Sequence, residues 1–176
     1  MKIDVVTHCP FPLADVFEAM RDQLPALAEY MPNIASIEVK SREELDDGEV
    51  KLVNRWQAAQ TEVPAAARPF VKPEQLYWLD HAHWMPGQMR CDWRLEMAFM
   101  TERIDCRGST TYHEVKDGGT ETRIVGELKL DLKGLVPRLM VNKVTGMVED
   151  FVGRMIQPNF QKTTDALTAY LESKKA

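Results

Sequence analysis

Two histidines separated by one alanine, His81-Ala82-His83, have the spacing in this sequence that comes closest to a metal site. On a β-strand, residues two apart point to the same side, so both imidazoles would face one ion. Zinc sites use three or four protein ligands, and a third would have to come from His8 or His113. We therefore interpret the two histidines as polar residues on a strand face, and we predict neither a bound metal nor a cofactor.

Enzyme motifs do not appear elsewhere in the chain. The sequence has no HExxH metal motif, no GxSxG nucleophile elbow and no glycine-rich phosphate loop. An acid–base mechanism of the cyclase, aromatase or dehydratase type would have Asn54, Tyr112 and His113 available. Because no nucleophile–base pair is evident, the sequence favours a binding protein and assigns no catalytic residue, while leaving enzymatic activity open.

The clearest pattern is an alternation over residues 89–99. Apolar side chains occupy every second position, at Met89, Cys91, Trp93, Leu95, Met97 and Phe99. Charged residues fill most positions between them, so the pattern predicts a strand with one buried and one solvated face. A similar alternation over residues 50–57 favours a second such strand. If Trp56 and Trp93 share the inner face with Leu95, Met97 and Phe99, these side chains either line a cavity or form a plain core.

The elements that would position these residues follow from periodicity and turn signals. The sequence predicts a first strand over 2–8 and a helical segment over 13–31, which Pro25 divides into two short helices meeting near 22–24. Further strands are expected at 37–40, 50–57, 77–84, 89–99, 102–115 and 123–133, with a proline-rich connection over 58–76. Short turns between consecutive strands favour an antiparallel meander.

The end of the chain has a helical pattern. Apolar residues recur at spacings of three and four at Val141, Val144, Val148, Phe151, Val152 and Met155. Pro158 should interrupt this helix, which gives one segment over about 136–157 and a second over about 158–172. A meander with one apolar face must cover that face, and this helix is the only element long enough to do so.

We therefore predict an apolar cavity between the sheet and the terminal helix. Its predicted ligand-binding residues are Asn54, Trp56, Trp93, Leu95, Met97, Phe99, Thr110, Tyr112, Leu128, Leu130, Val144, Val148, Phe151 and Met155. Asn54, Thr110 and Tyr112 are the candidates to anchor a polar group of the ligand, since apolar pockets carry a few placed polar side chains.

Composition bounds these interpretations. The 176 residues are 44% hydrophobic and 28% charged, which is typical of a globular protein, and we expect one domain over 1–176. A net charge of −5 argues against a nucleic-acid partner. No segment approaches the roughly 18 apolar residues of a membrane span, and no secretory signal is evident. We expect a cytoplasmic protein whose oligomeric state the sequence leaves open.

Three stretches carry a resemblance to a known superfamily. They are His8-Cys9-Pro10-Phe11-Pro12-Leu13-Ala14-Asp15-Val16-Phe17 at the first strand-to-helix junction, Tyr30-Met31-Pro32-Asn33-Ile34 at the helix exit, and Glu121-Thr122-Arg123-Ile124-Val125-Gly126-Glu127-Leu128 in the last strand. With the element order, they resemble the START-like, or birch-pollen-allergen-like, helix-grip proteins over essentially the whole chain. These include polyketide cyclases, aromatases, lipid-transfer domains and hormone receptors.

The resemblance implies an α+β helix-grip fold. In this fold a curved antiparallel sheet carries two short helices near the N-terminus and a long C-terminal helix over the sheet. The proline-rich connection and Trp78 also have a spacing similar to PRELI-type phospholipid-transfer proteins, a more limited likeness.

Three functional hypotheses follow. The first is a protein that binds, and could also transport, a hydrophobic small molecule, foremost a lipid, with Arg138, Lys143 and Arg154 allowing transient contact with a membrane surface. The alternative is a polyketide cyclase, aromatase or dehydratase-like enzyme that uses the same cavity. The third is a regulatory module that acts through protein contacts, which would need an exposed apolar patch.

Overall fold

The computed structural model describes residues 1–59, 76–98, 101–131, 139 and 159–175. These residues contain a seven-stranded antiparallel sheet with the strand order β1-β7-β6-β5-β4-β3-β2. The strands are β1 (Lys2–Cys9), β2 (Ile34–Glu44), β3 (Val50–Ala58), β4 (Tyr77–Met85), β5 (Arg90–Met97), β6 (Ile104–Glu114) and β7 (Thr120–Leu130). The predicted meander is confirmed from β2 to β7, and β1 is an edge strand that pairs with β7.

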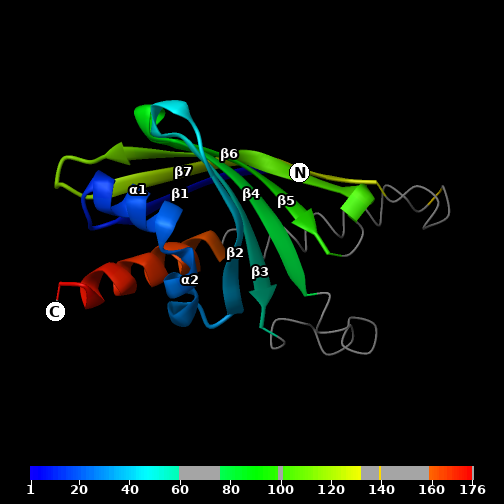
Figure 1. The fold of residues 1–176 in the computed structure, drawn as a ribbon, viewed down its shortest axis with the longest axis horizontal. Helices are drawn as coiled ribbons and strands as arrows, with labels where there is room; N and C mark the ends of the chain where they lie inside the picture. Colours follow the sequence, from blue (N-terminus) through cyan, green and yellow to red (C-terminus); the bar gives the residue numbers. More distant parts are fainter. Residues whose placement is uncertain (60–75, 99–100, 132–138, 140–158, 176) are drawn as a thin grey trace.

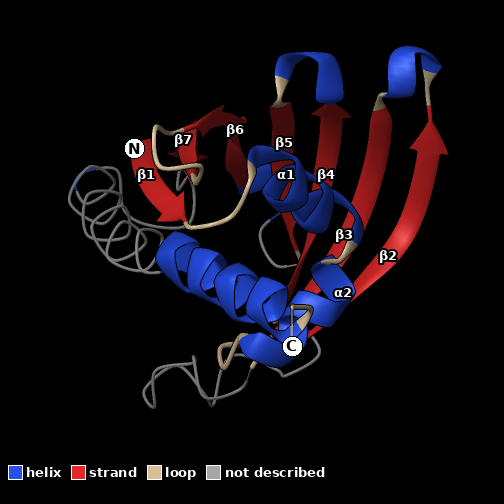
Figure 2. Ribbon diagram, turned by 90° about the vertical axis from the view of Figure 1, so that its left-hand side faces the viewer, coloured by secondary structure: helices blue, strands red, loops and turns tan. Residues whose placement is uncertain are grey.

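The sheet is curved, and the helices lie on its concave side (Figure 1, Figure 2). They are α1 (Leu13–Asp22), α2 (Leu24–Leu27), a 3₁₀ turn η1 (Ala28–Tyr30) and a C-terminal helix over residues 159–173. Further 3₁₀ turns are η2 (Asp46–Gly48), η5 (Pro86–Gln88) and η6 (Thr101–Arg103). Among the described segments, no helix is long and apolar enough to cross a membrane.

The predicted break between two short helices is confirmed at Gln23. Pro25 lies in the first turn of α2, where its missing N–H costs no helical hydrogen bond. The predicted second terminal segment matches the helix over 159–173. The first segment, predicted over 136–157, lies outside the described residues except for position 139, and so does most of the connection over 58–76. The predicted strand over 102–115 begins later, at Ile104, because η6 precedes it.

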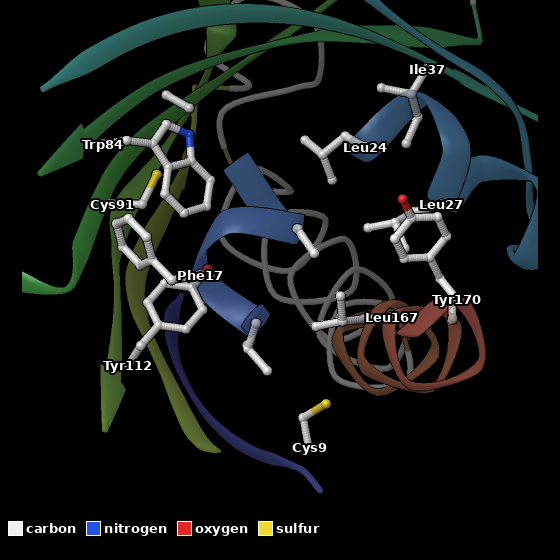
Figure 3. Packing of buried hydrophobic residues seen from close by; sticks show 14 of the residues in the cluster. Cys9, Phe17, Leu24, Leu27, Ile37, Trp84, Cys91, Tyr112, Leu167 and Tyr170 are labelled. Carbon is white, nitrogen blue, oxygen red and sulfur yellow. The ribbon is translucent and has the colours of Figure 1, made fainter. Parts of the chain in front are cut away.

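The core joins the helices to the sheet. Phe17 of α1 packs edge-on against Trp84 of β4 and Tyr112 of β6, with ring centroids 5.2 and 5.3 Å away (Figure 3). Leu27 of α2 is fully buried, and Leu167 of the C-terminal helix belongs to the same cluster. These contacts bring α1, α2 and the C-terminal helix onto one face of the sheet.

One indole lies across two neighbouring strands at a pair of glycines. Gly108 of β6 pairs with Trp93 of β5 on one side and with Gly126 of β7 on the other. A Cβ atom at Gly108 would lie 2.6 Å from the Trp93 ring and 2.3 Å from the Val125 carbonyl oxygen. A Cβ atom at Gly126 would lie 2.8 Å from the same ring. The absent side chains therefore make the space in which Trp93 lies over the sheet.

Replacing Gly108 with alanine should therefore destabilise the protein. We expect the free energy of unfolding to fall by about 1–3 kcal/mol, because overpacking forces side chains and backbone to shift. Urea unfolding followed by circular dichroism measures the change. Gly87→Ala is the matched control, since a Cβ atom there meets nothing within 4 Å. Equal stabilities for the two variants would contradict the close approach of Trp93.

Candidate functional site

A cavity of about 430 Å³ lies between the concave face of the sheet and the C-terminal helix. Strands β3 to β7 supply most of its described lining, α1 and α2 contribute Met20 and Leu24, and the C-terminal helix contributes Phe160 and Leu167. Cavities of this size and apolar character are typical of sites for drug-sized organic molecules. The cavity is therefore the candidate binding site.

Seven of the residues predicted to bind a ligand line this cavity: Trp56, Trp93, Leu95, Met97, Thr110, Tyr112 and Leu128. They meet there because alternate side chains of a strand point to one face, and the register aligns those faces. Trp93, for example, lies opposite Ala82 of β4, which also lines the cavity. Their role in binding remains a prediction.

The other predicted residues lie elsewhere. Asn54 is 1% exposed and lies beside the cavity without lining it. Leu130 lies two residues after Leu128 on β7 and does not line the cavity. It packs against the buried cluster that contains Ile3 and Cys106. Five more lie outside the described residues, namely Phe99, Val144, Val148, Phe151 and Met155.

Aromatic rings form a large part of the lining. Trp56 and Trp78 stack across β3 and β4, with centroids 5.6 Å apart and planes 17° from parallel. Trp84 and Tyr112 stack at 6.1 Å and 29°. The Trp93 indole N–H donates to the Thr110 hydroxyl at 3.1 Å, which satisfies its polar edge. The sheet therefore presents flat apolar surfaces to the cavity.

Asp80 of β4 is the most unusual residue of this lining. It lies on the same face of the strand as Trp78, Ala82 and Trp84, and Asn54 of β3 is its direct cross-strand partner. Among the described lining residues, Asp80 alone carries a charge at neutral pH. None of the described residues forms an ion pair with it.

Burial raises the pKa of Asp80 from its ordinary value of 3.8 to about 6. The Asn54 amide, the His81 charge and the Trp56 indole N–H each lower this pKa, but loss of hydration outweighs them. Asp80 is half-buried and is one of the residues that line the cavity. The cavity therefore holds a carboxyl group that changes its charge near pH 6.

Nearby groups stay neutral. Burial raises the pKa of the Cys91 thiol and of the Tyr112 phenol well above their usual values, and the charge of Asp80 adds to both shifts. Burial also raises the pKa of Cys106 to about 11. At neutral pH these side chains can donate hydrogen bonds but carry no charge, so the electrostatics of the described lining depend on Asp80.

The histidines are turned away from the cavity. His81 pairs with Glu96 at 3.1 Å and His83 with Glu49 at 2.7 Å, so each imidazole has its own carboxylate. Within the described ranges, no three histidine, cysteine or carboxylate side chains gather as a metal site requires. His113 is exposed and contacts the Thr111 hydroxyl, and Asn54 does not line the cavity. Of the three candidates of the acid–base hypothesis, only Tyr112 is among the described lining residues.

A second hollow, of about 500 Å³, is open and lies on the outer face of the sheet. Two of its lining residues form ion pairs within a strand: Arg90 with Asp92 on β5, and Arg107 with Asp105 on β6. Because this hollow is open and encloses little, it is a weaker candidate site.

Sequence reasoning missed several lining residues, above all Asp80. A signal for it was present, because Trp78, Asp80, Ala82 and Trp84 alternate and therefore share one face of the predicted strand. An acid in phase with tryptophans is a polar group on the buried face. Asn159, Thr163 and Thr164 were also missed, since the pattern of the C-terminal helix alone does not show which turn faces the sheet.

Comparison with solved structures identifies the fold of the chain, whereas comparison with protein families and curated proteins finds no match. No protein-family model matches the chain, and no curated protein matches it significantly. Among solved structures, TTHA0849 from Thermus thermophilus is 16% identical with a TM-score of 0.70, and the match covers 100% of both chains.

Two further structures agree with this result. The ZhuI aromatase/cyclase from Streptomyces sp. R1128 is 13% identical, with a TM-score of 0.66 over 100% of this chain and 96% of that one. Ara h 8.0201 is 15% identical, with a TM-score of 0.63 over 98% of each chain. The predicted architecture is thereby confirmed, and the chain has the helix-grip fold that these structures share.

Proposed function

We propose that this protein binds a hydrophobic small molecule, foremost a lipid, in the cavity between the curved sheet and the C-terminal helix. The observation that carries the proposal is the cavity of about 430 Å³, whose described lining is mostly aliphatic and aromatic. Burying apolar ligand surface there supplies the binding free energy, at about 25 cal/mol per Å². The similarity to an aromatase/cyclase supports an organic small molecule in this position.

Filling the cavity tests this proposal. Leu95 lines it from β5, so Leu95→Trp should occupy ligand space and weaken binding at least about ten-fold, equivalent to about 1.4 kcal/mol. Fluorescence titration with the neutral apolar probe N-phenyl-1-naphthylamine measures the affinity.

Arg94→Trp provides the matched control, because Arg94 is the preceding residue of the same strand and lines the outer hollow instead. Its affinity for the probe should equal that of the wild type. If both tryptophan variants bind the probe as the wild type does, the cavity is not the binding site.

Transport is the finer part of the proposal. It would require contact with a membrane surface, for which the basic residues Arg138, Lys143 and Arg154 were predicted, all outside the described residues. Transfer of a fluorescent lipid between donor and acceptor vesicles tests this part separately from binding.

A second candidate function is proton-transfer chemistry on a bound organic substrate, of the cyclase or dehydratase type. The observation that favours it is Asp80, whose pKa of about 6 suits a group that gives and takes protons near neutral pH. Under this alternative, Asp80→Asn should slow turnover of a co-purified ligand by about 10²–10⁴-fold. Mass spectrometry of the ligand before and after incubation measures that turnover, and equal rates for both proteins would exclude this role of Asp80.

A further inference from the structure

Within the described lining of the cavity, no positive charge accompanies the carboxylate of Asp80. Asp80 faces the cavity, and no described lysine, arginine or histidine lines it. A carboxylate removed from water is costly unless an opposite charge or several hydrogen bonds replace its hydration. The described residues do not provide that opposite charge, so a ligand is the natural source of it.

Two N–H groups of β3 lie near this carboxyl group. Asn54 is directly opposite Asp80 on β3, and Trp56 is its diagonal neighbour two residues along. The Asn54 amide and the Trp56 indole N–H both favour the ionised form of Asp80, although neither makes a hydrogen bond of normal length. Both N–H groups stabilise the charge, and Asp80 remains among the residues that line the cavity.

Aromatic faces lie next to this carboxyl group. Trp78 is the preceding residue on the same strand face as Asp80, and it stacks with Trp56 at 5.6 Å. Trp84 is two positions further along that face, beyond Ala82. Indole faces attract cations through their quadrupole, and the attraction is greatest where water is excluded. A carboxylate flanked by tryptophans is therefore complementary to a cationic group on an apolar body.

We propose that the ligand of this cavity carries a protonated amine, which pairs with the Asp80 carboxylate beside the Trp56–Trp78 stack while its apolar part fills the cavity. This inference rests on the proposed binding function and adds the charge of the ligand to it. A ligand with a carboxylate or phosphate at the same position would be repelled by Asp80. A neutral alcohol could donate one hydrogen bond but would leave the charge uncompensated.

The groups around Asp80 define the pH at which this selectivity acts. Cys91 of β5 and Tyr112 of β6 face the same space and remain neutral, and His81 lies on the opposite face of β4. The described lining residues of α1, α2 and the C-terminal helix include no titratable group. Selectivity for an amine should therefore follow the ionisation of Asp80 and decline as the pH falls below about 6.

Three isosteric probes test the inference: 1-naphthylmethylamine, 1-naphthylmethanol and 1-naphthoic acid. Calorimetric titration of the wild type at pH 7.5 should show the amine binding at least about ten-fold more tightly than the alcohol, as expected for a cation paired in a partly dry site. The acid should bind more weakly than the alcohol. At pH 5, where the amine is still protonated, its advantage should shrink.

Two variants separate the role of Asp80 from total charge. Asp80→Asn should abolish the preference for the amine over the alcohol. Asp92→Asn removes the same charge from the outer face of β5, where Asp92 pairs with Arg90, and should keep the preference. Equal binding of all three probes to the wild type, or an unchanged preference in Asp80→Asn, overturns the inference alone. Failure of every probe to bind contradicts the proposed binding function itself.

Discussion

Replacing Asp80 with asparagine should make the ligand-free protein more stable at pH 7, by up to about 3 kcal/mol. The pKa of Asp80 rises from 3.8 to about 6 on folding, and each pKa unit is equivalent to about 1.36 kcal/mol. Asparagine has nearly the same shape and carries no charge to desolvate. For a chain of this length, the melting temperature should rise by about 6–12 °C.

The sign of the pH dependence follows from proton binding. Between pH 3.8 and about 6 the folded protein holds a proton on Asp80 that the unfolded chain has released. The stability that this proton gives the folded protein is fully present below pH 3.8 and is lost as the pH rises through 6. Urea unfolding of both proteins from pH 4 to pH 8 should therefore show a stability difference that grows with pH and levels off above about 7.

Asp92→Asn is the control for this measurement. Asp92 is on the outer face of β5 and pairs with Arg90, so its replacement should not stabilise the protein at any of these pH values. A wild type as stable as Asp80→Asn at pH 8 would show that Asp80 is hydrated or paired in the folded protein. That result would also remove the electrostatic basis for preferring a cationic ligand.

Replacing Phe17 with alanine should destabilise the protein by about 3–5 kcal/mol, the usual cost of removing a buried phenylalanine ring. Phe17 is 2% exposed and contacts the rings of both Trp84 and Tyr112 edge-on. It joins α1 to β4 and β6, two strands that also line the cavity. Thermal and urea unfolding measure the loss, and affinity for an apolar probe should fall as the helices loosen.

Two further variants make this result specific. Phe17→Leu keeps most of the apolar volume and should lose less stability than Phe17→Ala. Val125→Ala removes methyl groups from a residue that is 44% exposed, and the free energy of unfolding should change by no more than about 0.5 kcal/mol. If Phe17→Ala costs no more than Val125→Ala, the aromatic cluster does not hold α1 on the sheet.

Local patterns predicted the elements well because they depend on neighbours in sequence. The alternation around Trp93 indicated β5, and Pro25 indicated the break between α1 and α2, as observed. The same patterns could not show that β1 pairs with β7, because the paired residues, such as Lys2 and Glu127, are far apart in the sequence. Nor could they show that Gly108 and Gly126 lie side by side beneath Trp93.

Alternation in the sequence was enough to show which side chains of one strand share a face, such as Trp93 and Leu95 of β5. Pairing of the strands then brings Trp56 of β3 onto the same apolar surface. Only the tertiary structure decided which of those side chains line the cavity and which are covered, as Asn54 is. It also decided that Asp80 faces the cavity with no described cation beside it. The reason is physical: alternation places a residue on a face, but hydration and charge compensation depend on what other elements bring to that face.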